Sequence, residues 1–463
     1  MDFLIVLAAL LFLMFAAYRG YSVILFAPIA ALGAVLLTNP AAVAPIFNTV
    51  FMPKMVSFVE LYLPVFLLGA VFGKLIELSG YSKAIVRSVI NLIGPGKAIA
   101  TIVIVCALLT YGGVSLFVVV FTVYPFAAEL FRQSGIPKRL MGGTIALGAF
   151  SFTMDSVPGT PQIQNIIPSA FFKTTTWAAP WLGLAGSAFI IVLGLTYLNW
   201  RRRQAMAAGE GYGTALVNEP APFEAERLPN PVLAFAPLVL VGALNFAFTR
   251  LIPLWYGATY SAELPGLPKP LVVDIKKMTA IWSVEAALLV GIIFVLIFAF
   301  RTIARRFAEG SRQAVSGALL ASINTASEYG FGGVIAALPG FAVVSGALQG
   351  IPNPLVKEAV SVTALAGITG SASGGLSIAL AAMSQTFIDG AQAAGIPMEV
   401  LHRVAAMASG GMDTLPHNGA VITLLAVTGL THRQAYKDIF AITLLKTLAV
   451  FFVIGLYYTT GIV

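Results

Sequence analysis

Long apolar runs follow one another along the whole 463-residue chain, and short polar turns separate them. A run of about twenty apolar residues can cross the hydrocarbon core of a bilayer as a helix. The runs lie at 2–18, 21–38, 55–79, 97–131, 139–175, 177–198, 230–250, 279–300, 313–341, 357–392, 398–430 and 439–461. One long polar stretch, 199–229, separates two groups of runs. The pattern predicts an all-α polytopic membrane protein with two halves, 1–198 and 230–463.

Composition agrees with this prediction. Hydrophobic residues make up 59% of the chain and charged residues 10%, and the mean hydropathy is +0.92. Soluble proteins carry about a quarter charged residues, so a water-soluble globule is excluded. The net charge of +8 does not indicate a nucleic-acid partner, because in a membrane protein an excess of Lys and Arg marks the loops that stay in the cytoplasm. The one cysteine, Cys106, lies in an apolar run, where we expect a small core residue.

Lysine and arginine gather in certain turns, which the positive-inside rule places in the cytoplasm. They are Arg19, Lys83, Arg87, Lys97, Arg132, Lys138, Arg139, Arg201–Arg203, Arg301, Arg305, Arg306, Arg312, Arg433 and Lys437. With all of them inside, both termini lie outside and 199–229 is a cytoplasmic linker. The exceptions, expected outside, are Lys269, Lys276, Lys277, Lys357 and Arg403.

Two of the runs have both ends on the same side in this topology. The run 97–131 begins beside Lys97 and ends at Arg132, so both its ends are inside. Two crossings need about forty apolar residues, more than this run contains, so a re-entrant hairpin is expected. The run 357–392 begins and ends outside and predicts a second hairpin. The runs 139–175 and 398–430 are interrupted by polar residues and predict broken helices.

Four motifs of the first half recur in the second half in the same order. Residues 73–81 (GKLIELSGY) match 333–341 (GVIAALPGF), and 110–118 (TYGGVSLFV) match 371–379 (SASGGLSIA). Residues 134–140 match 394–400, and 153–162 (TMDSVPGTPQ) match 411–420 (GMDTLPHNGA). The predicted topology gives the two copies opposite orientations, with about five membrane-spanning helices in each. Inverted repeats with discontinuous helices are typical of secondary transporters.

The repeat pairs the polar breaks. Unsatisfied backbone groups in lipid cost several kcal/mol, so a broken helix needs protein, water or ligand around it. Glycine lets a ligand approach the backbone, and helix N-termini favour an anion. Tight helix packing would explain any one of these glycine-rich turns alone. Four related turns favour a binding site for a small carboxylate, formed by Thr110, Tyr111, Gly112, Gly113, Ser115, Thr160, Ser371, Ser373, Gly374, Gly375, His417 and Asn418.

Three acids lie at membrane depth. Asp155 and Asp413 occupy equivalent positions in the two broken helices, and Glu328 lies in the run 313–341. A carboxylate there is costly and is by default a functional hypothesis, because burial favours the protonated form. An acid that caps a helix end is the structural alternative for Asp155 and Asp413. We predict that these three residues couple transport to protons. No metal cluster, nucleophile–base pair or phosphate-binding loop is apparent, so neither an enzyme nor a cofactor is expected.

At these motifs the chain resembles the gluconate:proton symporter (gluconate permease) family of the ion-transporter superfamily. The segments that carry the resemblance are 110–140, 152–168 and 409–432, and DTLPHNGAV (413–421) is most similar to the hydroxybutyrate-permease branch. The resemblance implies proton-coupled uptake of a small organic acid, such as 3-hydroxybutyrate or gluconate. It also implies a homodimer in the inner (plasma) membrane that works by an elevator mechanism.

Other functions remain open from the sequence. Sodium-dependent members of the superfamily carry Ser-Asn-Thr motifs at the hairpin tips and breaks, and this chain does not. That departure favours protons, with a sodium-coupled carboxylate symporter as an alternative. A gated organic-anion channel, an exporter or an exchanger would use the same polar breaks.

Overall fold

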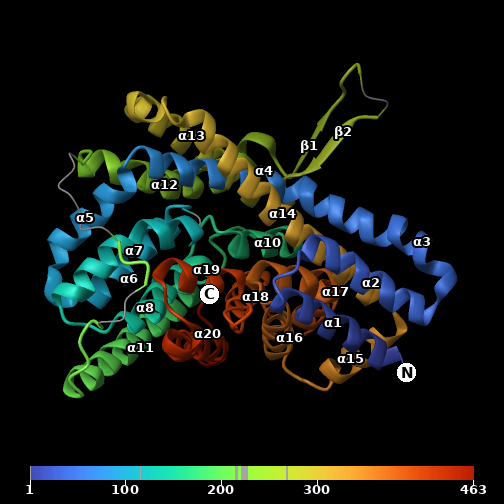
Figure 1. Ribbon diagram of the computed structural model, residues 1–463. Coiled ribbons are helices and arrows are strands. Elements are labelled where there is room, and N and C mark those ends of the chain that lie inside the picture. The colour runs from blue at the N-terminus through green and yellow to red at the C-terminus, as the bar shows by residue number, and fades with distance from the viewer. Residues whose placement is uncertain (1, 115, 214–216, 221–227, 267–268) are drawn as a thin grey trace.

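The computed structural model describes residues 2–114, 116–213, 217–220, 228–266 and 269–463 (Figure 1). Most of these residues are helical, which confirms the all-α polytopic class. The predicted site residue Ser115 lies outside the described residues. Within the described residues, five segments are long and apolar enough to cross a membrane: Pro40–Leu78, Pro180–Ala207, Pro231–Tyr256, Ile275–Ile303 and His432–Thr460.

The first half of the chain forms two helices, a long span, a helical hairpin and a broken helix. Its helices are α1 Asp2–Tyr18, α2 Val23–Thr38, α3 Val43–Ile46, α4 Met52–Leu78, α5 Tyr81–Ile93, α6 Ala98–Tyr111, α7 Leu116–Gln133, α8 Met141–Ala149, α9 Phe152–Asp155, α10 Ile163–Phe172 and α11 Pro180–Ala207. Short turns of 3₁₀ or π helix, η1 Pro40–Ala42, η2 Phe47–Phe51, η3 Pro95–Lys97 and η4 Lys138–Leu140, precede α3, α4, α6 and α8.

The second half has the same order of elements. Its helices are α12 Pro231–Tyr256, α13 Ile275–Ile303, α14 Phe307–Ala337, α15 Pro339–Gln349, α16 Pro354–Thr369, α17 Ala372–Ala393, α18 Met398–Ser409, α19 Gly419–Thr428 and α20 His432–Thr460. We call α6–α7 hairpin 1 and α16–α17 hairpin 2, with tips at 111–114 and 370–373. The first break is 156–162, between α9 and α10, and the second break is 410–418, between α18 and α19.

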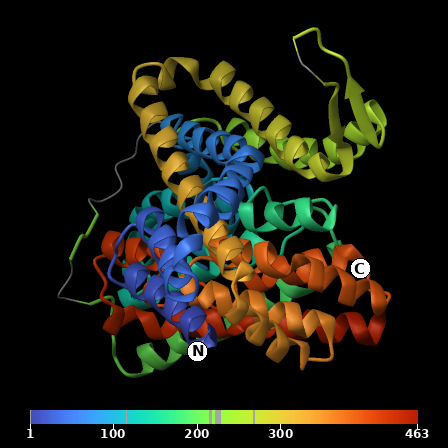
Figure 2. The same ribbon diagram turned by 90° about the vertical axis from the view of Figure 1, so that its right-hand side faces the viewer.

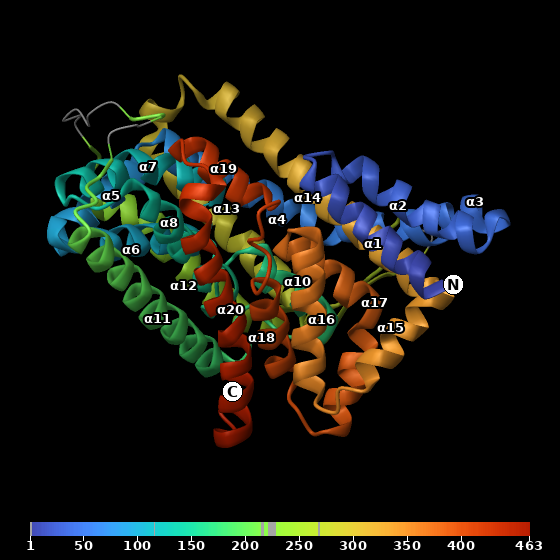
Figure 3. The same ribbon diagram turned by 60° about the horizontal axis from the view of Figure 1, so that its bottom comes forward.

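Several contacts made by helices of the first half have a counterpart made by the corresponding helices of the second half. α6 packs on α8 as α16 packs on α18, and α7 contacts α19 as α17 contacts α10. α2 contacts α14 as α13 contacts α4. The corresponding helices α4 and α14 pack on each other, as do α11 and α20 (Figure 3). Two halves related by a two-fold axis would produce this exchange.

Two features differ from the predicted elements. A β-hairpin, β1 Thr259–Ala262 paired antiparallel with β2 Leu271–Asp274, projects from the end of α12 (Figures 1 and 2). β-Branched residues on both sides of a proline-rich turn favour this local pairing over helix. The helix α11 continues through Arg201–Arg203 to Ala207, because Arg, Gln and Ala are good helix formers. The first residues of the predicted linker are therefore helical.

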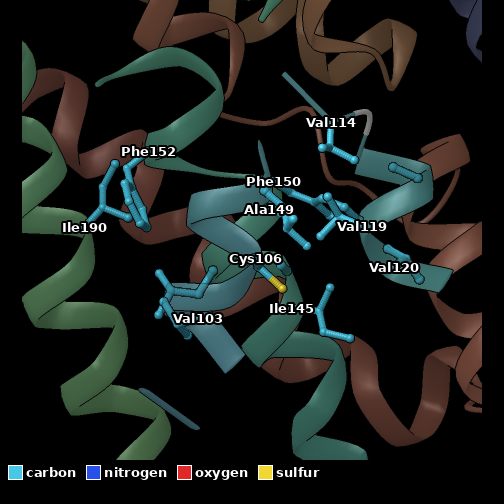
Figure 4. Close-up of a cluster of buried hydrophobic side chains, with 14 of the residues drawn as sticks. Val103, Cys106, Val114, Val119, Val120, Ile145, Ala149, Phe150, Phe152 and Ile190 are labelled. Carbon is cyan, nitrogen blue, oxygen red and sulfur yellow. The ribbon is translucent and has the colours of Figure 1, made fainter. Parts of the chain in front are cut away.

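A large apolar core surrounds hairpin 1 and the first broken helix. Cys106 is buried in it beside Val103, Ile145 and Phe150 (Figure 4). Gly148 of α8 lies so close to Cys106 and the Val103 backbone that a Cβ there would clash. This close approach of α6 and α8 fixes hairpin 1 against the helix that leads into the first break.

Candidate functional site

The two breaks meet at a buried lysine. Lys446 of α20 lies 2.6 Å from an Asp413 carboxylate oxygen, and its ammonium also donates to the Phe150 carbonyl at 2.9 Å. Both side chains of the pair are almost fully buried, at 2% and 5% exposure. Asp155 lies within electrostatic range of Lys446, Asp413 and Arg403. Sequence-predicted Asp155 and Asp413 are thus brought together, around a cation that the sequence analysis did not single out.

Asp155 also touches the second break directly. Its Oδ1 accepts a hydrogen bond from Ser156 Oγ at 2.6 Å. Its Oδ2 is buried and has no hydrogen-bond partner among the described residues. This oxygen lies against Gly410, where a Cβ would clash with it. The carboxyl group of the first break is therefore in contact with the backbone of the second break.

The first break is closed around Arg403 of α18. This fully buried guanidinium donates to the carbonyls of Asp155 (3.0 Å) and Ala178 (2.7 Å) and to Asn165 Oδ1 (3.0 Å). Arg403, which was expected outside as an exception to the positive-inside rule, is thus buried in the protein interior. Charged side chains are seldom buried unless paired, and here the unpaired backbone of the break supplies the acceptors.

Side-chain amides and hydroxyls satisfy the rest of the first break. Asn165 donates to the Thr160 and Thr176 carbonyls at 3.0 and 2.9 Å, and Asn245 donates to the Gly159 carbonyl at 2.9 Å. The predicted ligand Thr160 donates its hydroxyl to the Thr153 carbonyl at 2.7 Å. Trp177 fills the space where a side chain on Gly159 would lie. Side chains of neighbouring segments thus supply hydrogen bonds to several backbone groups of the first break.

The second break rests on the tip of hairpin 2. Asn418 Nδ2 donates to the Gly370 carbonyl at 2.8 Å, and its Oδ1 caps α19 by accepting from Val421 N–H at 2.9 Å. The ring of His417 packs against Gly370 and interacts with the backbone of Gly367 and Ile368. The predicted residues His417 and Asn418 are therefore adjacent to the predicted tip.

Glu328 lies at the same tip. It is buried on α14, and its carboxylate occupies the space beside Gly374, in the first turn of α17. Ser371 caps that turn, because its Oγ accepts from Gly374 N–H at 3.0 Å. Ser373 Oγ lies 3.3 Å from Thr325 Oγ1 of α14. Glu328, His417, Asn418, Ser371, Ser373 and Gly374 thus form one group around tip 2.

Tip 1 is packed differently. Gly112 and Gly113 face Leu238, Leu288, Phe72 and Pro161. Tyr111 OH donates to the Pro158 carbonyl at 3.1 Å, and Gln162 Nε2 donates to the Thr110 carbonyl at 2.7 Å. Tip 1 is therefore tied to the first break and lined by apolar side chains. On hairpin 2, Gly375 lies against Ala366, so close packing of the two arms accounts for that glycine.

Charged residues of the predicted cytoplasmic turns meet the linker. Glu219 accepts from Lys138 Nζ and Arg132 Nη2, both at 2.6 Å, and Glu210 pairs with Arg139 at 2.7 Å. Burial opposes ionisation of Glu219, but the hydrogen bonds from Lys138 and Arg132 outweigh it and lower its pKa. The Arg139 hydrogen bond lowers the pKa of Glu210. These contacts join α7, η4 and the linker at one end of the molecule.

Comparison with known proteins indicates what such an arrangement does. The chain is 57% identical, over the full length of both proteins, to a protein of Bacillus subtilis (strain 168) named uncharacterized transporter YxjC. The chain belongs to the YxjC transporter family. No family model matches it.

Two solved structures share the fold of this YxjC-family chain. The YdaH transporter of Alcanivorax borkumensis, described as having an unusual topology, has a TM-score of 0.51 and 15% identity, covering 92% of this chain and 90% of that one. MtrF of Neisseria gonorrhoeae, described as illuminating a class of antimetabolite efflux pumps, has a TM-score of 0.52 and 14% identity, covering 90% and 84%. The fold of the YxjC family is therefore a membrane-transporter fold.

Three buried residues of this YxjC-family site, Lys446, His402 and Arg403, were not predicted from the sequence. Lys446 lies in the middle of the apolar run 439–461, and a lone lysine at membrane depth is itself a functional signal. His402 and Arg403 lie near the start of a run, where cations are usually interfacial. His402 Nδ1 lies 2.6 Å from Thr174 Oγ1 in the interior. In the part of the chain that the structure describes, no cluster of His, Cys, Asp and Glu could hold a metal ion.

Proposed function

We propose that this transporter takes up a small organic monocarboxylate, of the hydroxy-acid class that includes 3-hydroxybutyrate and gluconate, together with protons. The observation that carries the proposal is the Asp155–Lys446–Asp413 group at the meeting point of the two breaks. The resemblance to gluconate permeases supplies the substrate class and the direction. The YxjC family and the two structural neighbours support transport in general.

The charges of this group favour a proton-binding role for Asp155. Asp413 already pairs with Lys446 at 2.6 Å, and the other cation in range of Asp155, Arg403, donates to backbone carbonyls and to Asn165 and not to the Asp155 carboxylate. An unpaired buried carboxylate is costly, and protonation removes that cost. Asp155 has a buried oxygen with no partner among the residues described, so it is the member of the group that gains most from a proton.

Proton binding at Asp155 would act on the contact between the breaks. The carboxyl oxygen that changes charge lies against Gly410, at the start of the second break. A charged Asp155 attracts Lys446 away from Asp413, and a neutral one leaves that pair intact. The protonation state thereby biases how the two broken helices pack, which is the kind of differential interaction that alternating access needs. Movement of the hairpins and broken helices as one elevator body is part of the proposal.

The substrate carboxylate is assigned to the group around tip 2. Helix N-termini at Ala372 and Gly419 open there and favour an anion. Gly419 is exposed, and no other group lies where its Cβ would be. His417, Asn418 and the hydroxyls of Ser371 and Ser373 supply further polar contacts for a hydroxy acid. We place the protein in the inner membrane as a homodimer, with both termini outside and 199–229 in the cytoplasm.

Transport by purified protein in proteoliposomes tests the proposal. An inside-alkaline pH gradient is expected to drive accumulation of labelled 3-hydroxybutyrate or gluconate above equilibrium. Asp155→Asn is expected to abolish that accumulation and to retain substrate exchange. Asp389→Asn is the matched control, because Asp389 is exposed on hairpin 2 and accepts a hydrogen bond from Gln385 Nε2. Wild-type flux that only equilibrates the label indicates a channel. Accumulation driven by a sodium gradient, or outward pumping of the label, would contradict proton-coupled uptake.

A further inference from the structure

The carboxylate of Glu328 occupies an anion position on hairpin 2. Glu328 belongs to α14, yet its carboxyl oxygens lie where a Cβ on Gly374 would be, at the N-terminal turn of α17. The side chain is 3% exposed, and it makes no hydrogen bond or ion pair with any described residue. A buried carboxyl group without a partner is thus aimed at a helix N-terminus.

The helix end that it faces has unused donors. Ser371 satisfies only the Gly374 N–H, at 3.0 Å, and the Ser371 carbonyl accepts from Gly375 N–H at 2.9 Å. No hydrogen bond from the N–H groups of Ala372 and Ser373 to a described residue is present. The first turn of a helix this long carries a partial positive charge, which favours a carboxylate. The helix has 22 residues.

The charged side chains on the helices packed against α14 do not interact with Glu328. The helices packed on α14 that carry charged side chains are α4 and α17, with Lys54, Glu60, Lys74, Glu77 and Asp389. The ammonium of Lys54 lies over the ring of Tyr329, the residue after Glu328, at 5.7 Å from the ring centroid. None of the five interacts electrostatically with Glu328.

The feature belongs to one half of the molecule only. The matched glycines Gly73 and Gly333 place Leu68 at the position equivalent to Glu328. Tip 1 accordingly faces apolar side chains, whereas tip 2 faces a carboxylate. An acid that served only to stabilise the repeated fold would have no reason to occur at one tip alone.

We propose that Glu328 is a resident substitute for the substrate carboxylate at tip 2. While ionised, it occupies the N-terminus of α17 and keeps that site from a substrate anion. When one proton adds to a Glu328 oxygen, the neutral acid loses its attraction to the helix end, and the substrate carboxylate takes its place. One negative charge thus replaces another at tip 2, and Glu328 binds one proton for each substrate, apart from any proton on Asp155. This mechanism rests on the proposed proton-coupled carboxylate transport and assigns its substrate position.

Binding of 3-hydroxybutyrate and gluconate to the purified full-length protein, measured over a pH series, tests the mechanism. Exchange of one carboxylate for another with uptake of one proton weakens wild-type binding by about tenfold per pH unit above the titration of Glu328. Glu328→Gln is expected to bind with the same affinity at every pH. Gly374→Ala, which displaces the Glu328 carboxylate but keeps the acid, is expected to flatten the pH dependence as well.

Glu358→Gln is the matched control. Glu358 on α16 is equally buried and its carboxyl oxygens have no partner in the described part of the chain, but it lies a dozen residues before tip 2. This variant is expected to keep the wild-type slope. A Glu328→Gln protein that keeps that slope overturns the role of Glu328 alone, and Asp155→Asn then identifies the acid responsible. Wild-type binding that does not change with pH, or no binding of either probe by wild type and Glu328→Gln, overturns the proposed function as well.

Discussion

The two helix breaks share a Met-Asp motif but are stabilised by different means. At the first break, Arg403, Asn165 and Asn245 donate to carbonyls that no helical N–H satisfies. At the second break, Asn418 and His417 rest on tip 2, and Asp413 depends on one lysine. The first break is thus held by buried donors from several helices, whereas the second break depends on a few contacts to tip 2 and on one ion pair.

This difference assigns separate tasks to residues that the repeat makes equivalent. The first break fixes Asp155 in position and presents one of its oxygens to Gly410. The second break carries the substrate-facing group and the Lys446–Asp413 pair. The repeat gives the two breaks the same surroundings of helices, whereas positions that differ between the halves, such as Leu68 and Glu328, give them different chemistry.

Loss of Arg403 should have the largest effect on stability. Arg403→Met keeps an apolar stem of similar length but leaves the Asp155 and Ala178 carbonyls without donors. Each unsatisfied buried group costs about 1–3 kcal/mol, so the variant should lose most of its folded protein. Size-exclusion profiles and thermal unfolding in detergent measure this. Arg433→Met, on the exposed first turn of α20, is the control. Wild-type unfolding temperature in Arg403→Met would show that the first break does not need its guanidinium.

Removal of Lys446 should abolish transport and reduce stability. Lys446→Met leaves Asp413 buried without its partner, and breaking such a pair costs about 3–5 kcal/mol. The double variant Lys446→Met/Asp413→Asn removes the unpaired charge and should recover most of that stability without recovering transport. Thermal unfolding and uptake are measured on the same preparations. Transport by the double variant would reduce the pair to a structural role.

A methyl group at Gly410 tests the contact between the breaks. Gly410→Ala places a Cβ against the Asp155 carboxylate, and overpacking of this kind costs about 1–3 kcal/mol. The uptake rate should fall strongly while the unfolding temperature changes little, because the methyl group separates the two breaks. Gly455→Ala on α20 is the control, since no atom lies near the added Cβ. Equal uptake by Gly410→Ala and Gly455→Ala would contradict a working contact between Asp155 and the second break.

The sequence predicted the elements better than their chemistry. Apolar runs and their polar interruptions predicted α6–α7, α16–α17 and both breaks, because bilayer thickness and backbone hydrogen bonding restrict what a membrane segment can do. Asp155 and Asp413 were found from the repeat. Arg403 was misplaced, because its acceptors are carbonyls from 155–178, and no sequence pattern shows which buried backbone groups lack partners. The packing of Glu328 on tip 2 depends on the tertiary contact between α14 and α17 and could not be read from the chain.

The linker contacts should give the smallest effect, and one that depends on pH. The pKa values of Glu210 and Glu219 are lowered by Arg139 and by Lys138 and Arg132, so their contribution to stability is present above the unfolded pKa, which is about 4.3. It is lost as pH falls through the lower folded values. Partly exposed pairs of this kind contribute about 1 kcal/mol or less, and salt screens them. Glu219→Gln should therefore lower the unfolding temperature slightly at neutral pH and not at acidic pH. The same decrease at both pH values would mean that Glu219 acts through packing and not through its charge.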